Sequence, residues 1–206
     1  MIKMEELIKA LKSRRMNGYM VKDRKEAFIK VMELIDTDRP IAAGGSETLN
    51  QIGILDELRS SYDKYKFVDR DQIKDNKFMK RYVMDNLPSE CTYLSGTNAI
   101  TKDGRLINID GYGNRVNGIA CGTKKVIIVV GKNKIVNDLE SGMVRVRNIA
   151  APPNTKRLNK KTPCINANQC MDCRSPERIC NVISIVEFQN DADRIHVIIV
   201  DEDLGY

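Results

Sequence analysis

The sequence predicts an α/β fold, in which a mixed or mostly parallel sheet is flanked by helices. Apolar residues recur at helical spacing in residues 4–15, and a second apolar face of this kind runs through residues 27–35. Residues 126–130 form an uninterrupted apolar run, which is typical of a strand covered on both faces. Because helical and strand patterns alternate along the chain, we expect a layered α/β domain.

The first third of the chain supplies two of these alternations. Asn17 and Gly18 tolerate left-handed backbone and are expected to end the first helix, before a short strand at residues 19–21. Asp23 is a suitable N-cap for the second helix. Pro40 then precedes a strand at residues 41–43, and apolar residues at helical spacing follow up to residue 55.

The rest of the chain continues the pattern. A short buried strand is predicted at residues 93–94 and a hairpin at residues 100–107, with Asp103-Gly104 at its turn. A helix is predicted over residues 134–149 and closing strands over residues 183–186 and 195–200. Residues 151–180 form a long irregular loop that contains the cysteines, and loops of such length are usually functional.

Composition and length limit the class of protein. The 206 residues are expected to form a single domain over residues 1–206, and 42% hydrophobic with 30% charged residues is typical of a soluble globular chain. No apolar run is long enough to span a bilayer, and the first residues lack a signal-peptide core, so a cytoplasmic location is expected. The net charge of +6 permits an anionic partner, but 5% aromatic residues without Trp argue against nucleic-acid binding.

Four cysteines lie close together in the irregular loop. They are Cys164, Cys170, Cys173 and Cys180, with the spacing C-x5-C-x2-C-x6-C. Thiolates are ligands for iron–sulfur clusters and zinc, and a flexible loop can fold around such a centre. Arg174 and Arg178 would offset part of the charge of four thiolates. An iron–sulfur cluster is slightly favoured, with zinc as the alternative.

Two other interpretations of these cysteines stay open. The spacing is looser than the bacterial ferredoxin pattern, and structural zinc sites usually have two close pairs where this chain has one. The four residues could instead be reduced thiols or form two disulfides. Cys91 and Cys121 stand alone among apolar or small residues, and we expect both to be packed in the interior.

A glycine-rich segment between a strand and a helix is the first candidate ligand site. Gly44 and Gly45 would let a ligand approach the backbone, while Ser46 and Thr48 offer hydroxyl groups near a helix N-terminus. Glu47 is a candidate catalytic carboxylate. The structural alternative is a glycine-rich turn followed by a helix cap.

A second polar segment spans residues 95–115. It contributes four further candidate ligand-binding residues, namely Asn98, Asp110, Asn114 and Arg115. Asp110 and Arg115 are also candidate catalytic groups, and Arg115 could hold a carboxylate or phosphate. Because loops at the carboxyl ends of neighbouring parallel strands converge, we expect this segment to share a cleft with the glycine-rich one. The alternative is that the segment builds tight turns and that Asp110 pairs with Arg115.

Two further features are expected to be structural. His196, the single histidine, lies in an apolar strand without a neighbouring nucleophile, so we interpret it as a structural side chain. Residues 200–206 contain three acidic residues and are expected to form a solvated tail.

At these segments the sequence resembles the LUD-domain family of lactate-utilisation proteins, formerly a domain of unknown function. The resemblance covers nearly the whole chain and rests on GGSETLNQIGI at 44–54, SGTNAITKDGRLINIDGYGNRV at 95–116, VVGKNKIVNDLESGMVRVRNIAAPPNTKRL at 129–158, and the cysteine loop. It implies a fold similar to that of ribose-phosphate isomerases, glucosamine-phosphate deaminases and CoA transferases. Those proteins place ligands at loops that follow the sheet strands.

The resemblance also implies a function. Family members take part in oxidising L-lactate to pyruvate in a system that includes iron–sulfur subunits, so other lactate-oxidation subunits are expected partners. This chain lacks the separate ferredoxin-like region of the larger iron–sulfur subunit, which leaves its own catalytic step unassigned. We therefore keep three hypotheses: a component of lactate oxidation that binds a small anion or redox partner, an independent enzyme for a phosphosugar or acyl-CoA-like substrate, and a metal-stabilised scaffold or regulatory subunit.

Overall fold

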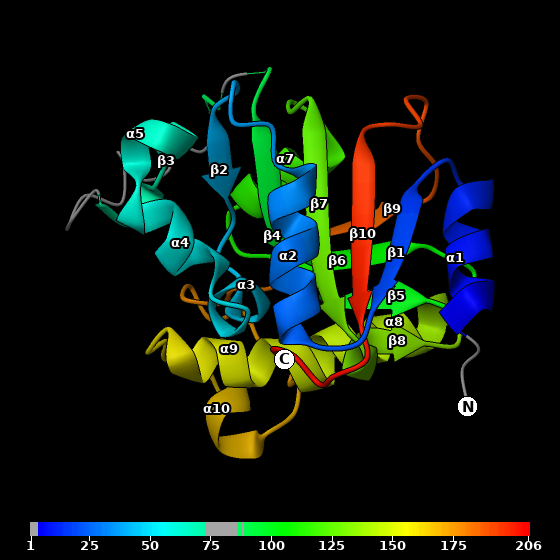
Figure 1. Ribbon diagram of the computed structural model, residues 1–206. Helices are drawn as coiled ribbons and strands as arrows, with labels where there is room; N and C mark the ends of the chain where they lie inside the picture. Colours follow the sequence, from blue (N-terminus) through cyan, green and yellow to red (C-terminus); the bar gives the residue numbers. More distant parts are fainter. Residues whose placement is uncertain (1–3, 73–85, 88) are drawn as a thin grey trace.

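A parallel sheet forms the centre of the protein in the computed structural model, which describes residues 4–72, 86–87 and 89–206. Within this part of the chain the sheet has the strand order β1-β10-β7-β4-β2-β3 (Figure 1). The strands are β1 (Asn17–Val21), β2 (Ile41–Ala43), β3 (Phe67–Val68), β4 (Thr92–Gly96), β7 (Lys125–Gly131) and β10 (Ile195–Val200). All neighbouring pairs are parallel, which confirms the predicted α/β class.

The apolar run that ends at Val130 lies in the middle of this sheet. β7 pairs with β10 on one side and β4 on the other, so the strand is covered by sheet or helix in every direction. Ile127 and Val129 face one hydrophobic cluster, while Val126 and Ile128 face the other. All four side chains are fully buried. The continuous apolar run therefore reflects burial on both faces of a central strand.

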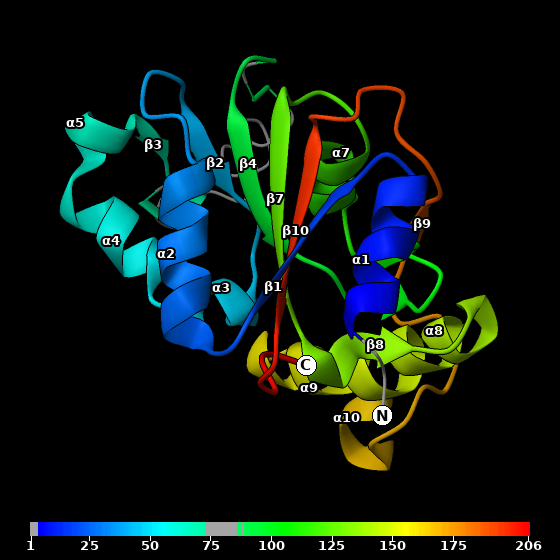
Figure 2. The same cartoon turned by 45° about the vertical axis from the view of Figure 1, so that its right-hand side comes forward.

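Helices cover both faces of the main sheet. On one face lie α2 (Arg24–Leu34), α3 (Glu47–Gln51), α4 (Ile54–Ser60) and α5 (Tyr62–Tyr65), and on the other lie α1 (Met4–Ser13) and α7 (Asn114–Ala120) (Figure 2). Asp23 caps α2 as predicted, since its side chain accepts hydrogen bonds from the amides of Lys25 and Glu26. The apolar pattern expected to run to residue 55 is divided, because Gly53 adopts a left-handed φ of 78° between α3 and α4.

A smaller sheet packs beside the main one. Its strand order is β8-β5-β6-β9 among the described residues, with β5 (Ala99–Thr101), β6 (Leu106–Asp110), β8 (Ile135–Val136) and β9 (Val182–Val186). The predicted hairpin is confirmed as the antiparallel pair of β5 and β6, and Gly104 adopts a φ of 88° at its turn. The chain enters this sheet directly after β4 and again after β7, so the ends of these strands lie at the junction of the two sheets.

The helix predicted over residues 134–149 differs from the structure at both ends. Residues 132–134 form a 3-10 turn, and α8 (Leu139–Arg145) begins only after Asp138, whose carboxylate accepts a hydrogen bond from the amide of Ser141. The helical path then continues through a π-helical turn (Val146–Ala150) into α9 (Ala151–Arg157). Two prolines stand in the first turn of α9, and their missing amide hydrogens coincide with the change from the π-helical turn to α9.

The irregular loop predicted over residues 151–180 is consequently shorter than expected. Its first seven residues belong to α9, and Cys164 begins a further short helix, α10 (Cys164–Ala167). The first helix of the chain also ends differently: Arg15 is the left-handed residue, with φ of 58°, and Asn17 already belongs to β1.

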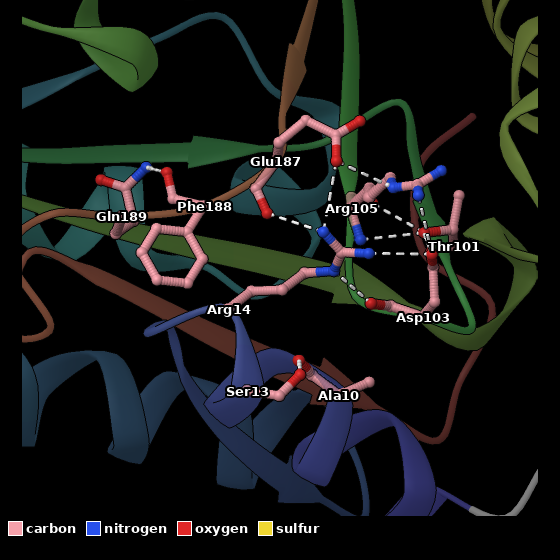
Figure 3. A network of polar contacts seen from close by, with 9 residues as sticks. All are labelled: Ala10, Ser13, Arg14, Thr101, Asp103, Arg105, Glu187, Phe188 and Gln189. Carbon is pink, nitrogen blue, oxygen red and sulfur yellow. Dashed lines mark hydrogen bonds and ion pairs between the residues drawn. The ribbon is translucent and has the colours of Figure 1, made fainter.

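A surface network joins three segments that are distant in sequence. Arg14, which follows α1, donates through Nη2 to Asp103 Oδ2 at 2.9 Å and through Nη1 to the carbonyl oxygen of Glu187 at 2.8 Å (Figure 3). Arg105 Nε lies 3.0 Å from Glu187 Oε2. These contacts connect the N-terminal helix to the β5–β6 hairpin and to the segment after β9.

The last six residues are not a solvated tail. Leu204 is 1% exposed and packs in the first hydrophobic cluster, and its amide donates to Asn133 Oδ1 at 3.2 Å. The amide of Gly205 donates to Gln51 Oε1 at 2.8 Å. The acidic residues at 201–203 led to the prediction of a solvated tail, but the apolar Leu204 that follows them is buried. In the described ranges, no helix has the length and apolarity that crossing a membrane requires.

Candidate functional site

The carboxyl ends of four neighbouring strands meet at one edge of the main sheet. β2 runs into the glycine-rich segment, β4 into Thr97 and Asn98, β7 into the 3-10 turn with Lys134, and β10 into the C-terminal segment. α9 and the C-terminal segment lie across this edge, at the bottom of the view in Figure 1. In a parallel sheet such an edge is the usual place for a ligand site.

A cavity of about 500 Å³ lies at this edge. It brings the two polar segments together, because Gly45 and Ser46 line it with Asn98, Asp110, Asn114 and Arg115. Glu47 belongs to the lining as well. The two segments therefore lie at the same cavity, as expected. A cavity of this size is within the range that small-molecule sites occupy.

Arg115 supports the cavity wall from the second residue of α7. Its two terminal nitrogens make four hydrogen bonds, to Gly96 O at 3.2 Å, Asn108 Oδ1 at 2.7 Å, Asn98 Oδ1 at 2.6 Å and Ile109 O at 2.8 Å. Its Nε lies 3.7 Å from Asp110 Oδ2. Burial lowers the pKa of Arg115, while the charge of Asp110 acts in the opposite direction. With four donors used inside the protein, the side chain holds β4 and β6 together.

Asp110 and Asn114 shape the turn that leads into α7. Asp110 Oδ1 accepts hydrogen bonds from the amides of Tyr112 and Gly113 at 3.0 and 2.9 Å. Gly113 then adopts a φ of 83°, which is a conformation that favours glycine, and Asn114 begins the helix. Both proposed structural alternatives are thus present: the segment builds a tight turn, and Asp110 pairs with Arg115.

Ser46 and the glycines arrange the opposite wall. Ser46 is the N-cap of α3, since its Oγ accepts a hydrogen bond from the amide of Leu49 at 3.3 Å. A Cβ on Gly45 would lie 2.5 Å from Arg70 Nη2, so the missing side chain leaves room for this guanidinium. Arg70 comes from the 3-10 turn η1 (Arg70–Gln72) and also lines the cavity.

Gly44 and Thr48 lie behind the lining rather than in it. A Cβ on Gly44 would lie 2.6 Å from the hydroxyl oxygen of Tyr93 and 3.0 Å from Arg115 Cγ. Thr48 is fully buried, and its hydroxyl donates to Leu204 O at 3.5 Å. These two residues were expected to contact a ligand, but their neighbours in the described structure are protein groups.

Lys134 is the most unusual group in the cavity. It lines the cavity although it is only 5% exposed, and its Nζ donates to Thr48 Oγ1 at 2.9 Å. Burial lowers the pKa of Lys134 to about 7, and the nearby charges, Arg145 and Arg115, are both positive and act in the same direction. A lysine that is buried beside two cations is a candidate functional group.

Arg145 and the C-terminal segment enclose this lysine. Arg145 Nε donates to Asn133 O at 3.1 Å and its Nη1 donates to Tyr206 O at 3.2 Å. Burial lowers the pKa of Arg145 to about 10. A Cβ on Gly205 would lie 2.9 Å from Lys134 Nζ, so the segment packs directly against the amine, and Tyr206 lines the cavity.

The charges of the lining are unequal. Among the described residues that line the cavity, six side chains are basic, namely Arg70, Arg115, Lys134, Arg157, Lys160 and Arg178. Three are carboxylates, namely Glu47, Asp110 and Glu177. Reasoning from sequence identified only Arg115 among these cations as a site residue. Lys134 could have been predicted as a site residue from its position just after the buried strand β7, because ligands bind at the carboxyl ends of parallel strands.

The four cysteines of the loop are absent from the cavity lining among the described residues. All four are partly exposed free thiols, and Arg178 donates hydrogen bonds to the carbonyl oxygens of Cys173 and Cys180. Within the described residues, no three His, Cys, Asp or Glu side chains are close enough to hold a metal ion together. The iron–sulfur or zinc centre therefore stays a prediction from sequence, and no functional step is assigned to it.

The remaining predicted residues lie away from the cavity edge. His196 is near the start of β10, where Tyr19 OH lies 3.0 Å from its Nδ1 and Asp193 O lies 2.9 Å from its Nε2. Burial lowers the pKa of His196, in keeping with a structural role. Cys91 is buried as predicted, but the prediction for Cys121 is wrong, because this thiol is exposed at the end of α7.

Comparisons with known proteins agree with this architecture. The family model of the LUD domain matches residues 4–200. The crystal structure of a DUF162 family protein from Deinococcus radiodurans is similar over 96% of this chain and 95% of its own, with a TM-score of 0.56 and 11% identity. The structure of eIF2B delta from Chaetomium thermophilum matches 58% of this chain and 51% of its own chain at 15% identity. Its TM-score of 0.33 is too low to support a conclusion about fold or function. No curated protein matches the sequence.

The chain belongs to the LUD domain family, because the family model covers nearly its whole length. The family is associated with lactate utilisation in general. At 11% identity, the similarity to the Deinococcus protein establishes the fold alone.

Proposed function

We propose that this protein is a component of lactate utilisation that binds a small organic anion in the cavity at the carboxyl edge of its main sheet. The observation that carries the proposal is the excess of basic over acidic side chains in the lining, with the buried Lys134 among the basic ones. Buried cations are costly unless a counter-charge is present, and an anionic ligand would supply it. Membership of the LUD domain family supports the connection to lactate metabolism.

The walls of the cavity also suit a polar ligand. Ser46, Asn98 and Asn114 add hydroxyl and amide groups to the charged lining. We assign Arg70 and Arg157 to the ligand, because both terminal nitrogens of Arg115 already donate hydrogen bonds to protein oxygens. In this proposal Asp110 and Arg115 position the wall and do not themselves take part in chemistry.

A second candidate function follows from the volume. A cavity of about 500 Å³ has room for more than a three-carbon acid. A phosphosugar or the end of an acyl-CoA would also match a cationic lining, and either would make the protein an independent enzyme. A protein that binds none of these compounds would instead be a scaffold or a regulatory subunit.

Isothermal titration calorimetry with L-lactate, pyruvate, ribose 5-phosphate and acetyl-CoA separates these functions. The informative variant is Lys134→Met, and Lys132→Met is its matched control. Lys132 belongs to the same 3-10 turn but is exposed and paired with Asp201 at 3.0 Å. Losing an ordinary hydrogen bond costs ~0.5–1.5 kcal/mol, so Lys134→Met should bind its ligand roughly 2–13-fold more weakly than the parent.

The results distinguish the hypotheses directly. Binding of lactate or pyruvate that Lys134→Met weakens and Lys132→Met preserves would support the proposal. Preferential binding of ribose 5-phosphate or acetyl-CoA would support the independent enzyme. If no compound binds the parent protein, the proposed function is wrong.

A further inference from the structure

Lys134 is placed as a nucleophile would be. Its Nζ is held by Thr48 Oγ1 at 2.9 Å and Lys134 is among the residues that line the cavity, so the amine has a fixed position beside the cavity. At 5% exposure it is shielded from bulk water, and the backbone of Gly205 packs against it. Thr48 is itself fully buried at the start of α3, which fixes the point to which the amine is anchored.

The charges around this amine favour its neutral form. Arg145 reaches the region from α8 and Arg115 from α7, and both lower the pKa of Lys134 in addition to the effect of burial. With the pKa of Lys134 at about 7, a large fraction of the amine is unprotonated near neutral pH, whereas an exposed lysine is almost fully protonated there. A neutral amine is a nucleophile, and desolvation beside other cations is a known way to produce one.

We propose that Lys134 Nζ forms a reversible Schiff base with an anion that carries a ketone or aldehyde carbonyl group. This inference rests on the proposed function, since it names the class of anion that the cavity would take. Two sources share the required chemistry: a 2-oxo acid such as pyruvate, and the open-chain form of an aldose phosphate such as ribose 5-phosphate.

The reaction is balanced without another reactant. The lone pair of Nζ attacks the carbonyl carbon while one amine proton moves to the carbonyl oxygen, which forms a carbinolamine. The second amine proton and the hydroxyl group then leave together as water, and a carbon–nitrogen double bond remains. Neither partner is oxidised or reduced, and addition of water reverses the step. The cationic side chains at Arg70 and Arg157 would hold the carboxylate or phosphate of the ligand meanwhile.

Reductive trapping tests this inference. The parent protein, Lys134→Met and Lys132→Met are incubated near pH 7 with pyruvate or with ribose 5-phosphate, in separate arms, and sodium cyanoborohydride. Intact-mass measurement then counts the adducts, and peptide mapping assigns them to residues. Circular dichroism verifies that each variant is folded, and the mapping of the parent protein tests the inference even if Lys134→Met does not fold.

The expected result is one adduct per chain of the parent protein at Lys134 in one of the two arms. Lys132→Met should react equally, and Lys134→Met should not react at that position. The inference is overturned if calorimetry shows that pyruvate or ribose 5-phosphate binds but no adduct forms at Lys134, and in that case the proposed function stands if the bound compound is pyruvate. It is also overturned if adducts are spread evenly over surface lysines. If neither compound binds nor reacts, the inference fails, and the proposed function fails with it unless L-lactate binds.

Discussion

Replacing Arg115 by alanine removes the guanidinium that joins α7 to the end of β4 and to β6. Two of the acceptors still have another hydrogen-bond donor in the variant. Gly96 O accepts from the hydroxyl of Ser95 at 2.9 Å, and Asn98 Oδ1 accepts from the amide of Ile109 at 2.9 Å. Asn108 Oδ1 and Ile109 O lose their donors at 2.7 and 2.8 Å, and both residues are buried. Asp110, whose side chain is 10% exposed, loses its cation.

The magnitude follows from the acceptors and the carboxylate that lose the guanidinium. A buried acceptor without a partner costs about 1–3 kcal/mol, and breaking a buried ion pair by removing one member costs about 3–5 kcal/mol. Because the separation from Asp110 is 3.7 Å and the carboxylate retains two amide donors, we expect a total near the lower figures, about 3–5 kcal/mol. For a chain of this size that corresponds to a fall in Tm of roughly 6–20 °C.

Urea and thermal unfolding of Arg115→Ala measure this loss, with Arg157→Ala as the matched control. Arg157 lines the same cavity, but it is exposed and donates to Asn154 Oδ1 one turn away on the same helix. Its replacement should change stability by at most ~0.5 kcal/mol. If Arg115→Ala unfolds at the same temperature as Arg157→Ala, the guanidinium is not structural and is free for a ligand.

Three further predictions concern the pH dependence, the glycines and the cysteines. Because the pKa of Lys134 falls from 10.5 to about 7 on folding, the unfolded chain binds more protons between these values, and the contribution of Lys134 to stability rises with pH across this window. Lys134→Met should therefore be more stable than the parent near pH 6, and the difference in urea unfolding should shrink toward pH 10; an equal difference at both pH values would contradict this reasoning. Gly45→Ala should displace Arg70 and weaken anion binding with little change in Tm, whereas Gly44→Ala should lower Tm, because its Cβ would meet the buried hydroxyl of Tyr93. If calorimetry finds the anion affinity of Gly45→Ala unchanged, Arg70 is not a ligand group. For the cysteines of residues 164–180, anaerobically purified protein should contain iron and sulfide and absorb visible light; stoichiometric zinc would favour a structural site, and absence of both metals would refute a metal centre.

The sequence by itself determined the class of fold and the two segments that meet at the cavity. Periodicity is a local property, so the helix at residues 4–13, the buried strand at 125–131 and the hairpin around Gly104 follow from residue spacing and turn chemistry. The convergence of the glycine-rich segment with Asn98 follows from the rule that parallel strands share a carboxyl edge. No long-range contact had to be known for either step.

Only the tertiary structure decided what individual side chains do at that edge. Arg115 has the pattern of an anion-binding residue in sequence, but folding surrounds it with four acceptors from β4 and β6 and their loops. Lys134 has the pattern of an ordinary surface lysine, but the C-terminal segment and Arg145 bury it, and this lowers its pKa. The free energy of a charge depends on the groups that replace water around it, and those groups come from segments far apart in the chain.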